Sequence, residues 1–306
     1  MRKEVYHEGE LKVQRLLGED LMAARNGRGV AESIVRGAIK FIEKQPMAVV
    51  GSADVNGRIW ASVLIGDFGF VTVPNPNSLR FFEDKIRSAK SDVFFKNIDD
   101  VPAIGSLFIE LARRARYRVN GDVSRAGGLV DVSIKEAYPN CPKYIQRRIV
   151  SMPEHIKQTD GVTSGGHILG DDQINWIRSA DTFFVASSGP DNRLDVSHRG
   201  GNQGFVDVLS DGTLKVPDYQ GNSMYNTFGN FVTNPNAGIV FVDFEKGATL
   251  QLTGKAELLF DQTSDDDLEK TTGTGRFFLF HPEEWIQTDH HHDVNWEFVD
   301  YSPFNP

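Results

Sequence analysis

Trp60-Ala61-Ser62 and Gly105-Ser106-Leu107-Phe108-Ile109-Glu110 each have a second version later in the chain. The first matches Asp195-Val196-Ser197 at a shift of 135 residues, and the second matches Gly238-Ile239-Val240-Phe241-Val242-Asp243 at a shift of 133. A nearly constant shift held over separate segments indicates an internal repeat. Because this period is far longer than that of solenoid units, the sequence predicts two copies of a whole domain.

Length and charge narrow the class of protein. The chain has 306 residues, 40% of them hydrophobic, which is enough for two domains with their own cores. Its formal net charge of −9 disfavours nucleic acid as a partner, because phosphate neutralisation needs a basic face. The single cysteine excludes internal disulfides and suits a reducing compartment. With no signal-like apolar start and no apolar run of about 20 residues, we expect a cytoplasmic protein that does not bind membranes.

Helical and strand periodicities follow one another along each copy. Helical spacing predicts helices over 8–25 and 33–44, whereas Met47–Ser52 and Arg58–Leu64 indicate a hairpin with an Asn56-Gly57 turn. Further short strands, separated by polar and glycine-rich turns, follow in both copies, which is typical of small antiparallel barrels. The sequence therefore predicts a mainly β protein with flanking helices and two tandem barrels.

The predicted boundary between the copies lies at residue 150. We expect 1–150 to hold an N-terminal arm, the first barrel and a linker, and 151–306 to hold the second barrel. The linker, about 135–168, contains prolines and a glycine-rich piece. The acidic stretch Asp261–Glu269 indicates the beginning of a helix, and the prolines of the segment 301–306 forbid regular structure there.

Two clusters of chemically active residues are interpreted as surface features. His290-His291-His292 is expected to be an exposed polar loop rather than a metal site, because three consecutive side chains point in divergent directions. Arg113, Arg114, Arg116 and Arg118 resemble a phosphate patch, yet alternate residues of a strand face opposite sides. We therefore favour a solvated strand edge for these arginines.

The two copies differ most after their second strand. The second copy has Ser197-His198-Arg199-Gly200-Gly201 where the first has the apolar Ser62-Val63-Leu64-Ile65-Gly66. Arginine holds phosphate through two parallel hydrogen bonds, and a glycine-flanked loop lets backbone N–H groups approach the same anion. A surface arginine in a tight turn explains Arg199 equally well when it is taken alone. The polar loop Gly221–Asn226, which is longer than its counterpart in the first copy, favours a phosphate site.

These segments resemble a known family. The sequence resembles the pyridoxamine 5′-phosphate oxidase-like, FMN-binding split barrels, and within them the tandem branch of flavin-nucleotide-binding proteins, in the segments Asp195–Gly201, Val216-Pro217, Gly221-Asn222-Ser223, Asn230 and Thr249–Gly254. Typical of that branch are also His7-Glu8-Gly9-Glu10, Asn140-Cys141-Pro142-Lys143-Tyr144 and Tyr301-Ser302-Pro303-Phe304-Asn305-Pro306. The resemblance covers nearly the whole chain.

The resemblance implies FMN as the cofactor and a pseudo-dimer of split β-barrels within one chain, with the first copy as a lid. The residues implied for the phosphate and ribityl chain are Ser197, His198, Arg199, Asn222 and Ser223. Those implied near the flavin ring are Val216, Pro217, Thr249, Gln251, Cys141, Lys143 and Tyr144, and Asn230 belongs to the same pattern. For Cys141 we favour an ordinary buried thiol over a reactive one.

The chain also departs from the true oxidase. The Arg-Lys pair expected in the phosphate loop is Ser223-Met224 here, and no C-terminal Arg-x-His motif for a pyridoxal phosphate substrate is found. We therefore expect an FMN-dependent oxidoreductase of unknown substrate, with a small-molecule substrate or a separate electron-transfer donor as partner, a homodimer as a further option and no assigned catalytic residue. The alternatives are a non-enzymatic flavin carrier, sensor or storage protein, and a barrel that binds haem or a deazaflavin.

Overall fold

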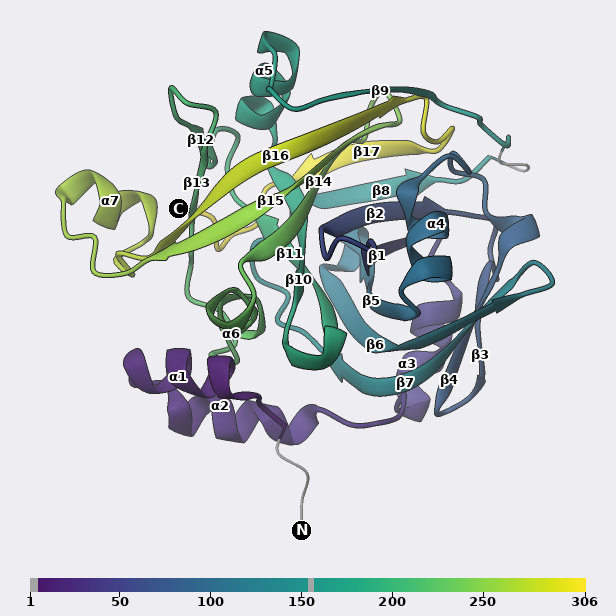
Figure 1. Ribbon diagram of the computed structural model, residues 1–306, viewed down its shortest axis with the longest axis horizontal. Helices are drawn as coiled ribbons and strands as arrows, with labels where there is room; N and C mark the ends of the chain where they lie inside the picture. Colours follow the sequence, from purple (N-terminus) through teal and green to yellow (C-terminus); the bar gives the residue numbers. More distant parts are fainter. Residues whose placement is uncertain (1–4, 154–156) are drawn as a thin grey trace.

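The computed structural model describes residues 5–153 and 157–306 (Figure 1). The start of the chain, and residues 154–156 of the expected linker, lie outside the described residues. The strands are β1 (Met47–Ala53), β2 (Ile59–Ile65), β3 (Val71–Asn75), β4 (Ser78–Phe82), β5 (Ala103–Glu110), β6 (Ala115–Ala126), β7 (Leu129–Pro139), β8 (Arg147–Ser151), β9 (Val162–Gly166), β10 (Thr182–Ser188), β11 (Leu194–Gly200), β12 (Asp207–Val208), β13 (Leu214–Pro217), β14 (Asn236–Asp243), β15 (Ala248–Leu259), β16 (Phe277–Asp289) and β17 (Asn295–Asp300). The α-helices are α1 (Glu8–Leu16), α2 (Asp20–Asn26), α3 (Arg36–Glu43), α4 (Val93–Asp100), α5 (Asp171–Ser179), α6 (Asn226–Thr233) and α7 (Asp265–Lys270).

The two large sheets share one strand order. The first runs β2-β1-β5-β6-β7-β4-β3 and the second runs β11-β10-β14-β15-β16-β13-β12, with β9 added beside β16. The registers agree as well, since Val50 lies opposite Ser62 and Val185 lies opposite Ser197. The prediction of a mainly β chain with two tandem split barrels is thus confirmed.

The predicted hairpin is present, and the turn between β1 and β2 contains Gly57 at φ +77°. The helix expected over 8–25 is two helices, because Gly18 adopts φ +68° and ends the first one. A left-handed backbone is cheap only for glycine, so Gly18 provides the corner between α1 and α2. Both helices lie below α6 of the second barrel in Figure 1.

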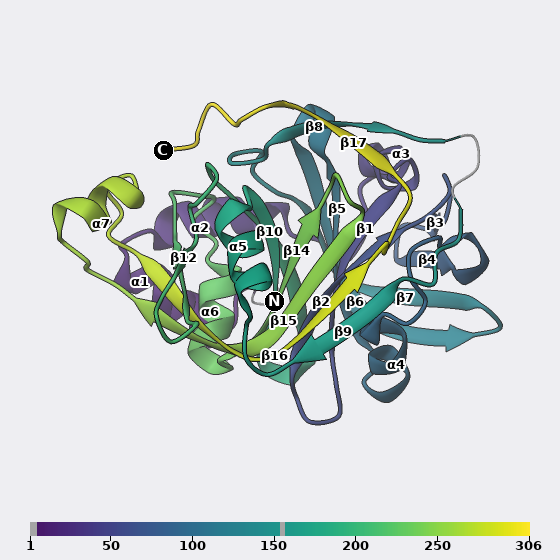
Figure 2. The ribbon, with the colours of Figure 1, turned by 90° about the horizontal axis from the view of Figure 1, so that it is seen from above.

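The expected linker is more ordered than predicted. It contains the end of β7 and the whole of β8 and β9. β8 pairs with β17, so that Val150 lies opposite Trp296, and the two form a separate small sheet (Figure 2). The segment after the first barrel is therefore held by strand pairing to the segment after the second.

The two barrels share a core. One hydrophobic cluster contains Val49, Ala61 and Val63 of the first barrel together with Phe184 and Val240 of the second, among others. The barrels therefore pack against each other through buried strand faces, and this contact positions the site described below. Trp60 is buried.

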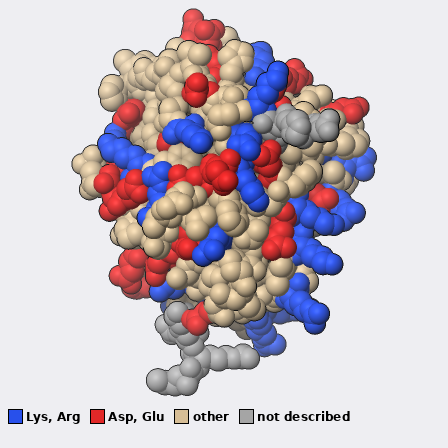
Figure 3. Space-filling view, turned by 90° about the vertical axis from the view of Figure 1, so that its right-hand side faces the viewer, with Lys and Arg blue, Asp and Glu red and all other residues tan. Residues whose placement is uncertain are grey.

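The surface over the first barrel carries acidic and basic side chains lying next to one another across the centre of the view (Figure 3). Among the described residues, no helix combines the length and the apolar character that crossing a bilayer requires.

Candidate anion-binding site between the two barrels

A cavity of about 110 Å³ lies where β6 of the first barrel meets β11 and α6 of the second. Its walls come from four segments: β6, the stretch after β7, the β11 strand, and the loop that leads from β13 into α6. It brings together most of the predicted site residues, namely Cys141, Lys143, Tyr144, Ser197, His198, Arg199, Pro217, Asn222 and Ser223.

Four predicted site residues do not line this cavity. Val216 is buried in the core of the second barrel, and Asn230 bonds to His7 and Ser187. Gln251 donates from Nε2 to two acceptors of the first barrel, on β2, and Thr249 lies two residues away on the same strand β15. β6 of the first barrel and β15 of the second hold the same place in the two strand orders, and each packs against the opposite barrel. Thr249 and Gln251 on β15 therefore face the first copy and not Arg199.

The arginines near β6 do not form the predicted solvated strand edge. β6 lies between β5 and β7, inside the sheet. Arg113 is exposed and Arg114 pairs with Asp300, but Arg116 and Arg118 line the cavity. Strand alternation correctly predicts that positions 116 and 118 share a face. The missing information was that the second barrel, and not water, covers that face.

Only one of these two arginines has a carboxylate partner. Arg118 is 3% exposed, and its Nε lies 2.8 Å from Oδ1 of Asp195. Its Nη2 donates to Oγ of Ser197 over 2.6 Å. Arg116 donates from Nε to the carbonyl oxygen of Cys141 over 2.6 Å, and among the described residues no carboxylate lies within ion-pair distance of it. Arg116 is therefore an unneutralised cation in the cavity wall.

Desolvation shapes the charges of the site. It lowers the pKa of Arg116 to about 9, assisted by the neighbouring charges of Arg118 and Arg199. A guanidinium with this pKa still carries its charge at neutral pH. Arg199 is paired, since its Nη1 lies 3.0 Å from Oδ1 of Asp218. Three arginines of the lining, Arg116, Arg118 and Arg199, are thus matched by two carboxylates, Asp195 and Asp218, and Asp218 is shared with Arg276.

His198 is a buried polar group of the same strand as Arg199. It is 5% exposed, and neither ring nitrogen has a hydrogen-bond partner in the part of the chain that the structure describes. Burial lowers the pKa of His198 well below its usual range, and Arg116 and Arg199 lower it further. The imidazole is therefore neutral, with one nitrogen able to donate and the other able to accept. On β11 the His198 side chain alternates with those of Ser197 and Arg199, and its ring lies 5.6 Å from that of Phe184, on the other face of the strand.

The first turn of α6 adds uncapped backbone donors to the same wall. Asn226 and Thr227 line the cavity, and the preceding Tyr225 adopts φ 56° and provides no side-chain cap. The N–H groups of a first turn have no partners within the helix, and they carry the positive end of the helix dipole. An anion beside Arg116 would lie near these groups.

Two tyrosines of the cavity lining, Tyr144 and Tyr219, pack against each other. The ring centroids of Tyr144 and Tyr219 are 4.9 Å apart, and the Tyr144 hydroxyl donates to the carbonyl oxygen of Gln220 over 3.0 Å. The enclosed volume suits a phosphate group, but it is smaller than the roughly 300–1,000 Å³ of sites that hold a whole cofactor. A larger ligand therefore requires the cavity to widen.

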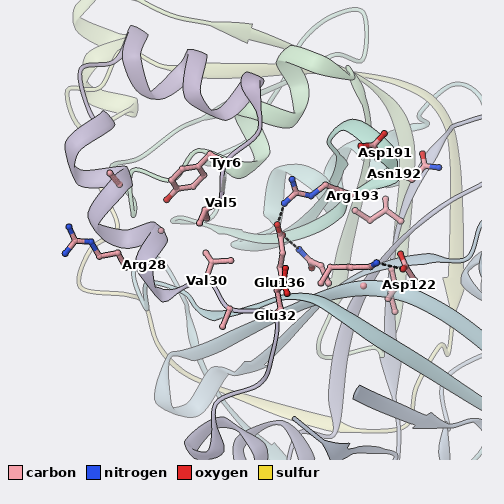
Figure 4. A pocket seen from close by; sticks show the side chains of 18 residues that line it. Val5, Tyr6, Arg28, Val30, Glu32, Asp122, Glu136, Asp191, Asn192 and Arg193 are labelled. Carbon is pink, nitrogen blue, oxygen red and sulfur yellow. Dashed lines mark hydrogen bonds and ion pairs between the residues drawn. The ribbon is translucent and has the colours of Figure 1, made fainter. Parts of the chain in front are cut away.

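A second cavity, of about 860 Å³, was not predicted from the sequence (Figure 4). It lies between the N-terminal residues around Tyr6 and Val30, the β6–β7 hairpin, and the turn before β11. Glu136 of β7 forms an ion pair with Arg193 of that turn. Because these charges of the lining neutralise each other, the larger cavity lacks the excess of cations that marks the smaller one.

The histidine run is not the exposed loop that we predicted. His290 is exposed, but His291 and His292 are 1% and 4% exposed, and Nε2 of His291 lies 2.7 Å from the carbonyl oxygen of Val63. Within 5–153 and 157–306, no group of three or more His, Cys, Asp or Glu side chains is arranged to hold a metal ion. His291 and His292 are instead packed between the barrels.

Comparisons with known proteins give matches among solved structures. No family model matches the sequence, and no curated protein matches it. A pyridoxamine 5′-phosphate oxidase-related, FMN-binding protein of Nostoc punctiforme is 10% identical, with a TM-score of 0.28, and the match covers 39% of this chain and 87% of that protein.

Two further solved structures differ in their ligands. A FAD-binding protein of Mesorhizobium loti is 14% identical, with a TM-score of 0.30, and the match covers 42% of this chain and 98% of that protein. The haem storage protein HutZ of Vibrio cholerae is 14% identical, with a TM-score of 0.29, and the match covers 38% of this chain and 90% of that protein. The ligand of this chain therefore has to be argued from its own residues. The structures that resemble it include pyridoxamine 5′-phosphate oxidase-like proteins, one of them FMN-binding, each matched by about 40% of this chain.

Proposed function

We propose that the chain binds FMN in the cavity between the barrels, with the phosphate beside Arg116, Arg199 and the first turn of α6. The observation that carries the proposal is Arg116, a desolvated cation without a carboxylate partner. An unpaired charge away from water is costly, so the site gains stability when an anion enters. In this proposal the second copy, 151–306, contributes Arg199 and the first turn of α6 to the phosphate site, and the first copy, 1–150, contributes Arg116 and the residues after β7.

The remaining lining supports a phosphate joined to a polyol and a flat ring. Guanidinium groups and helix N-termini are both suited to phosphate oxygens. The Ser197 hydroxyl accepts from Arg118 and Thr227 and can still donate its own proton to an oxygen such as those of a ribityl chain. Tyr144 and Tyr219 offer apolar ring faces at the cavity mouth. These residues fit the parts of FMN.

Bound FMN supplies hydride or electron transfer, and the protein supplies orientation and hydrogen bonds. We therefore propose a flavin-dependent oxidoreductase that acts on a small molecule or takes electrons from a separate donor. A non-enzymatic flavin carrier would use the same binding residues. Turnover with a reduced nicotinamide and oxygen separates these two roles.

A second candidate ligand is haem. Its motivation is the neutral imidazole of His198, since a proximal histidine is a common axial ligand of haem iron, but this ring packs against Phe184, on the other face of β11 from Arg199. The three cations of the wall suit haem propionates less specifically than they suit one phosphate.

The test compares FMN with riboflavin, which lacks the phosphate. We expect the purified protein to be yellow, and the apoprotein to bind FMN about 10–100-fold more tightly than riboflavin, because charge-assisted hydrogen bonds contribute about 1.5–3 kcal/mol. Arg116→Gln should remove most of this preference, whereas Arg113→Gln, at an exposed position, should leave it unchanged. Equal affinity for both compounds, or failure to bind either, contradicts the proposal. A Soret band would favour haem.

A further inference from the structure

The segment His7-Glu8-Gly9-Glu10 links α1 to the helix that borders the cavity. His7 caps α1, accepting from the Gly9 N–H at Nδ1 and donating its own N–H to Glu10. The same two side chains also reach α6, because Nε2 of His7 lies 2.8 Å from Oδ1 of Asn230, and Glu10 accepts from Nδ2 of Asn226 over 2.5 Å. Asn226 is a lining residue of the candidate site.

Gly9 and Gly229 let the two helices approach unusually closely. A Cβ at Gly9 would overlap the carbonyl oxygen of Gly229, and a Cβ at Gly229 would overlap Glu10. Neither position tolerates a larger residue without moving one helix away from the other. The spacing of the motif is therefore explained by the docking of α1 on α6.

The rest of the N-terminal arm, residues 5–29, holds the loop before α6. Three further contacts join them: Asn26 Nδ2 donates to the carbonyl oxygen of Asn222 over 2.7 Å, Gln14 Nε2 donates to that of Met224 over 2.9 Å, and the Tyr225 hydroxyl donates to Glu19 over 2.7 Å. Asn222, Ser223 and Tyr225 line the cavity, but Asn26, Gln14 and Glu19 do not.

This loop has a backbone that needs outside support. Ser223 and Tyr225 adopt φ 61° and φ 56°, a left-handed conformation that is strained for residues other than glycine. Such a conformation persists only where neighbouring structure fixes it. The arm contacts carbonyl oxygens and side chains on both sides of these two residues.

We propose that the N-terminal arm is the positioning element of the anion site: its docking on α6 fixes the loop 222–226 in the shape that binds the anion. The inference rests on the proposed function. Docking of the arm and binding of the ligand then favour each other, and by linkage each strengthens the other by the same factor. The arm residues themselves touch no ligand.

The experiment uses the full chain and FMN as the probe. Gly9→Ala should lower FMN affinity about 10-fold or more and raise amide hydrogen exchange in 8–26, whereas Gly37→Ala on α3, where a Cβ meets no atom within 4 Å, should change neither. In the wild type, FMN should slow exchange in 8–26, and FMN should dissociate faster from Gly9→Ala.

Asn26→Ala combined with Gln14→Ala gives a second route, because it removes two contacts without a steric clash. The same loss of affinity in this variant supports the inference. Unchanged FMN affinity while 8–26 exchanges faster, or no effect of FMN on wild-type exchange there, overturns it. If the wild type binds no FMN, the proposed function fails instead, so the two failures are distinguishable.

Discussion

The two barrels meet along two contacts, which we call seams: the first joins β6 to β11, and the second joins β2 to β15. Both seams contain the same hydrogen bonds. In the first, Arg118 donates to the carbonyl oxygen of Val196 and to the Ser197 hydroxyl, over 3.0 and 2.6 Å. In the second, Gln251 donates to the matching atoms of residues 61 and 62, over 2.9 Å each. Gln251 follows Arg118 by the 133-residue shift of the repeat. The same hydrogen-bonding pattern is therefore made by a cation, Arg118, at the first seam and by a neutral amide, Gln251, at the second.

The helices at the two seams differ in the same sense. Asp92 caps α4, accepting from the Phe94 N–H over 2.9 Å and from the Ser62 hydroxyl over 2.6 Å. Tyr225 stands in the equivalent position before α6 and provides no cap. The chain therefore places its own carboxyl group at the N-terminus of α4, whereas Tyr225 gives the N-terminus of α6 no side-chain cap. We accordingly expect one FMN per chain, at the seam of Arg118.

The largest expected effect comes from giving the first seam the residue of the second. Arg118→Gln can keep both hydrogen bonds but leaves Asp195 buried without its partner. Removing one member of a buried ion pair typically costs about 3–5 kcal/mol, so urea unfolding should show a loss of that size. Arg118→Gln combined with Asp195→Asn should recover most of it. Equal stability of the single and double variants would contradict this account.

The next largest effect is the pH dependence of stability that Glu10 of the N-terminal arm causes at the first seam. Burial raises the pKa of Glu10 from 4.5 to about 7, where it faces Asn226, His7, Arg193 and Asp195. The folded state binds the Glu10 proton more tightly than the unfolded state does. Protonated Glu10 therefore adds on the order of 3 kcal/mol to the free energy of unfolding below pH 4.5, and this contribution is lost as the pH rises through 7. Unfolding free energies measured between pH 5 and 8 should fall less steeply in Glu10→Gln than in the wild type. If unfolding free energy depended on pH in the same way in the wild type and in Glu10→Gln, Glu10 would not be the cause of the pH dependence.

A smaller effect is expected at the second seam. Asp92→Ala removes a helix cap and should lower the unfolding free energy by about 1–2 kcal/mol, while Asp92→Asn, which can still cap, should lose less. Calorimetric titration should give one FMN per chain in both variants, because Thr249 and Gln251 bring no cation to that seam. If Asp92→Ala bound a second equivalent of FMN, the Asp92 carboxyl group alone would be what keeps FMN from binding at the second seam.

The smallest effect is expected for Cys141→Ser. The carbonyl oxygen of Cys141, and not its thiol, accepts from Arg116, and that contact survives the substitution. FMN affinity should change by less than about twofold, within the usual range for substitutions that remove no partner. A tenfold loss would show that the thiol itself faces the ligand.

Local patterns predicted the parts of the molecule that depend on neighbouring residues. The β1–β2 hairpin, α3 and the helix after Asp261 all follow from turn residues and periodicity. The break at Gly18 was missed because a single glycine inside a helical pattern is tolerated in many helices. These outcomes reflect short-range physics.

The site was predicted less completely because it is built across the repeat. The segment 197–199 and the stretch after β7 were expected at one site, and the cavity contains both. Arg116, Arg118 and His291 were assigned to the surface, because no periodicity tells which strand face a second barrel will cover. Gln251 was expected near the flavin ring of the second copy, but it donates to Ser62 of the first copy at the other contact between the barrels. Docking of the two barrels, a long-range event, decides these positions.

The pairing of β8 with β17 has a consequence for when the cavity closes. Ser151 lies opposite Asn295, and the backbone N–H of Tyr144 donates to the Ser302 hydroxyl over 3.1 Å. The part of the lining around Tyr144 is therefore fixed by residues that leave the ribosome more than 140 positions later. During synthesis the first barrel can form early, but its contribution to ligand retention has to wait for the second, since closing so long a loop comes late in folding.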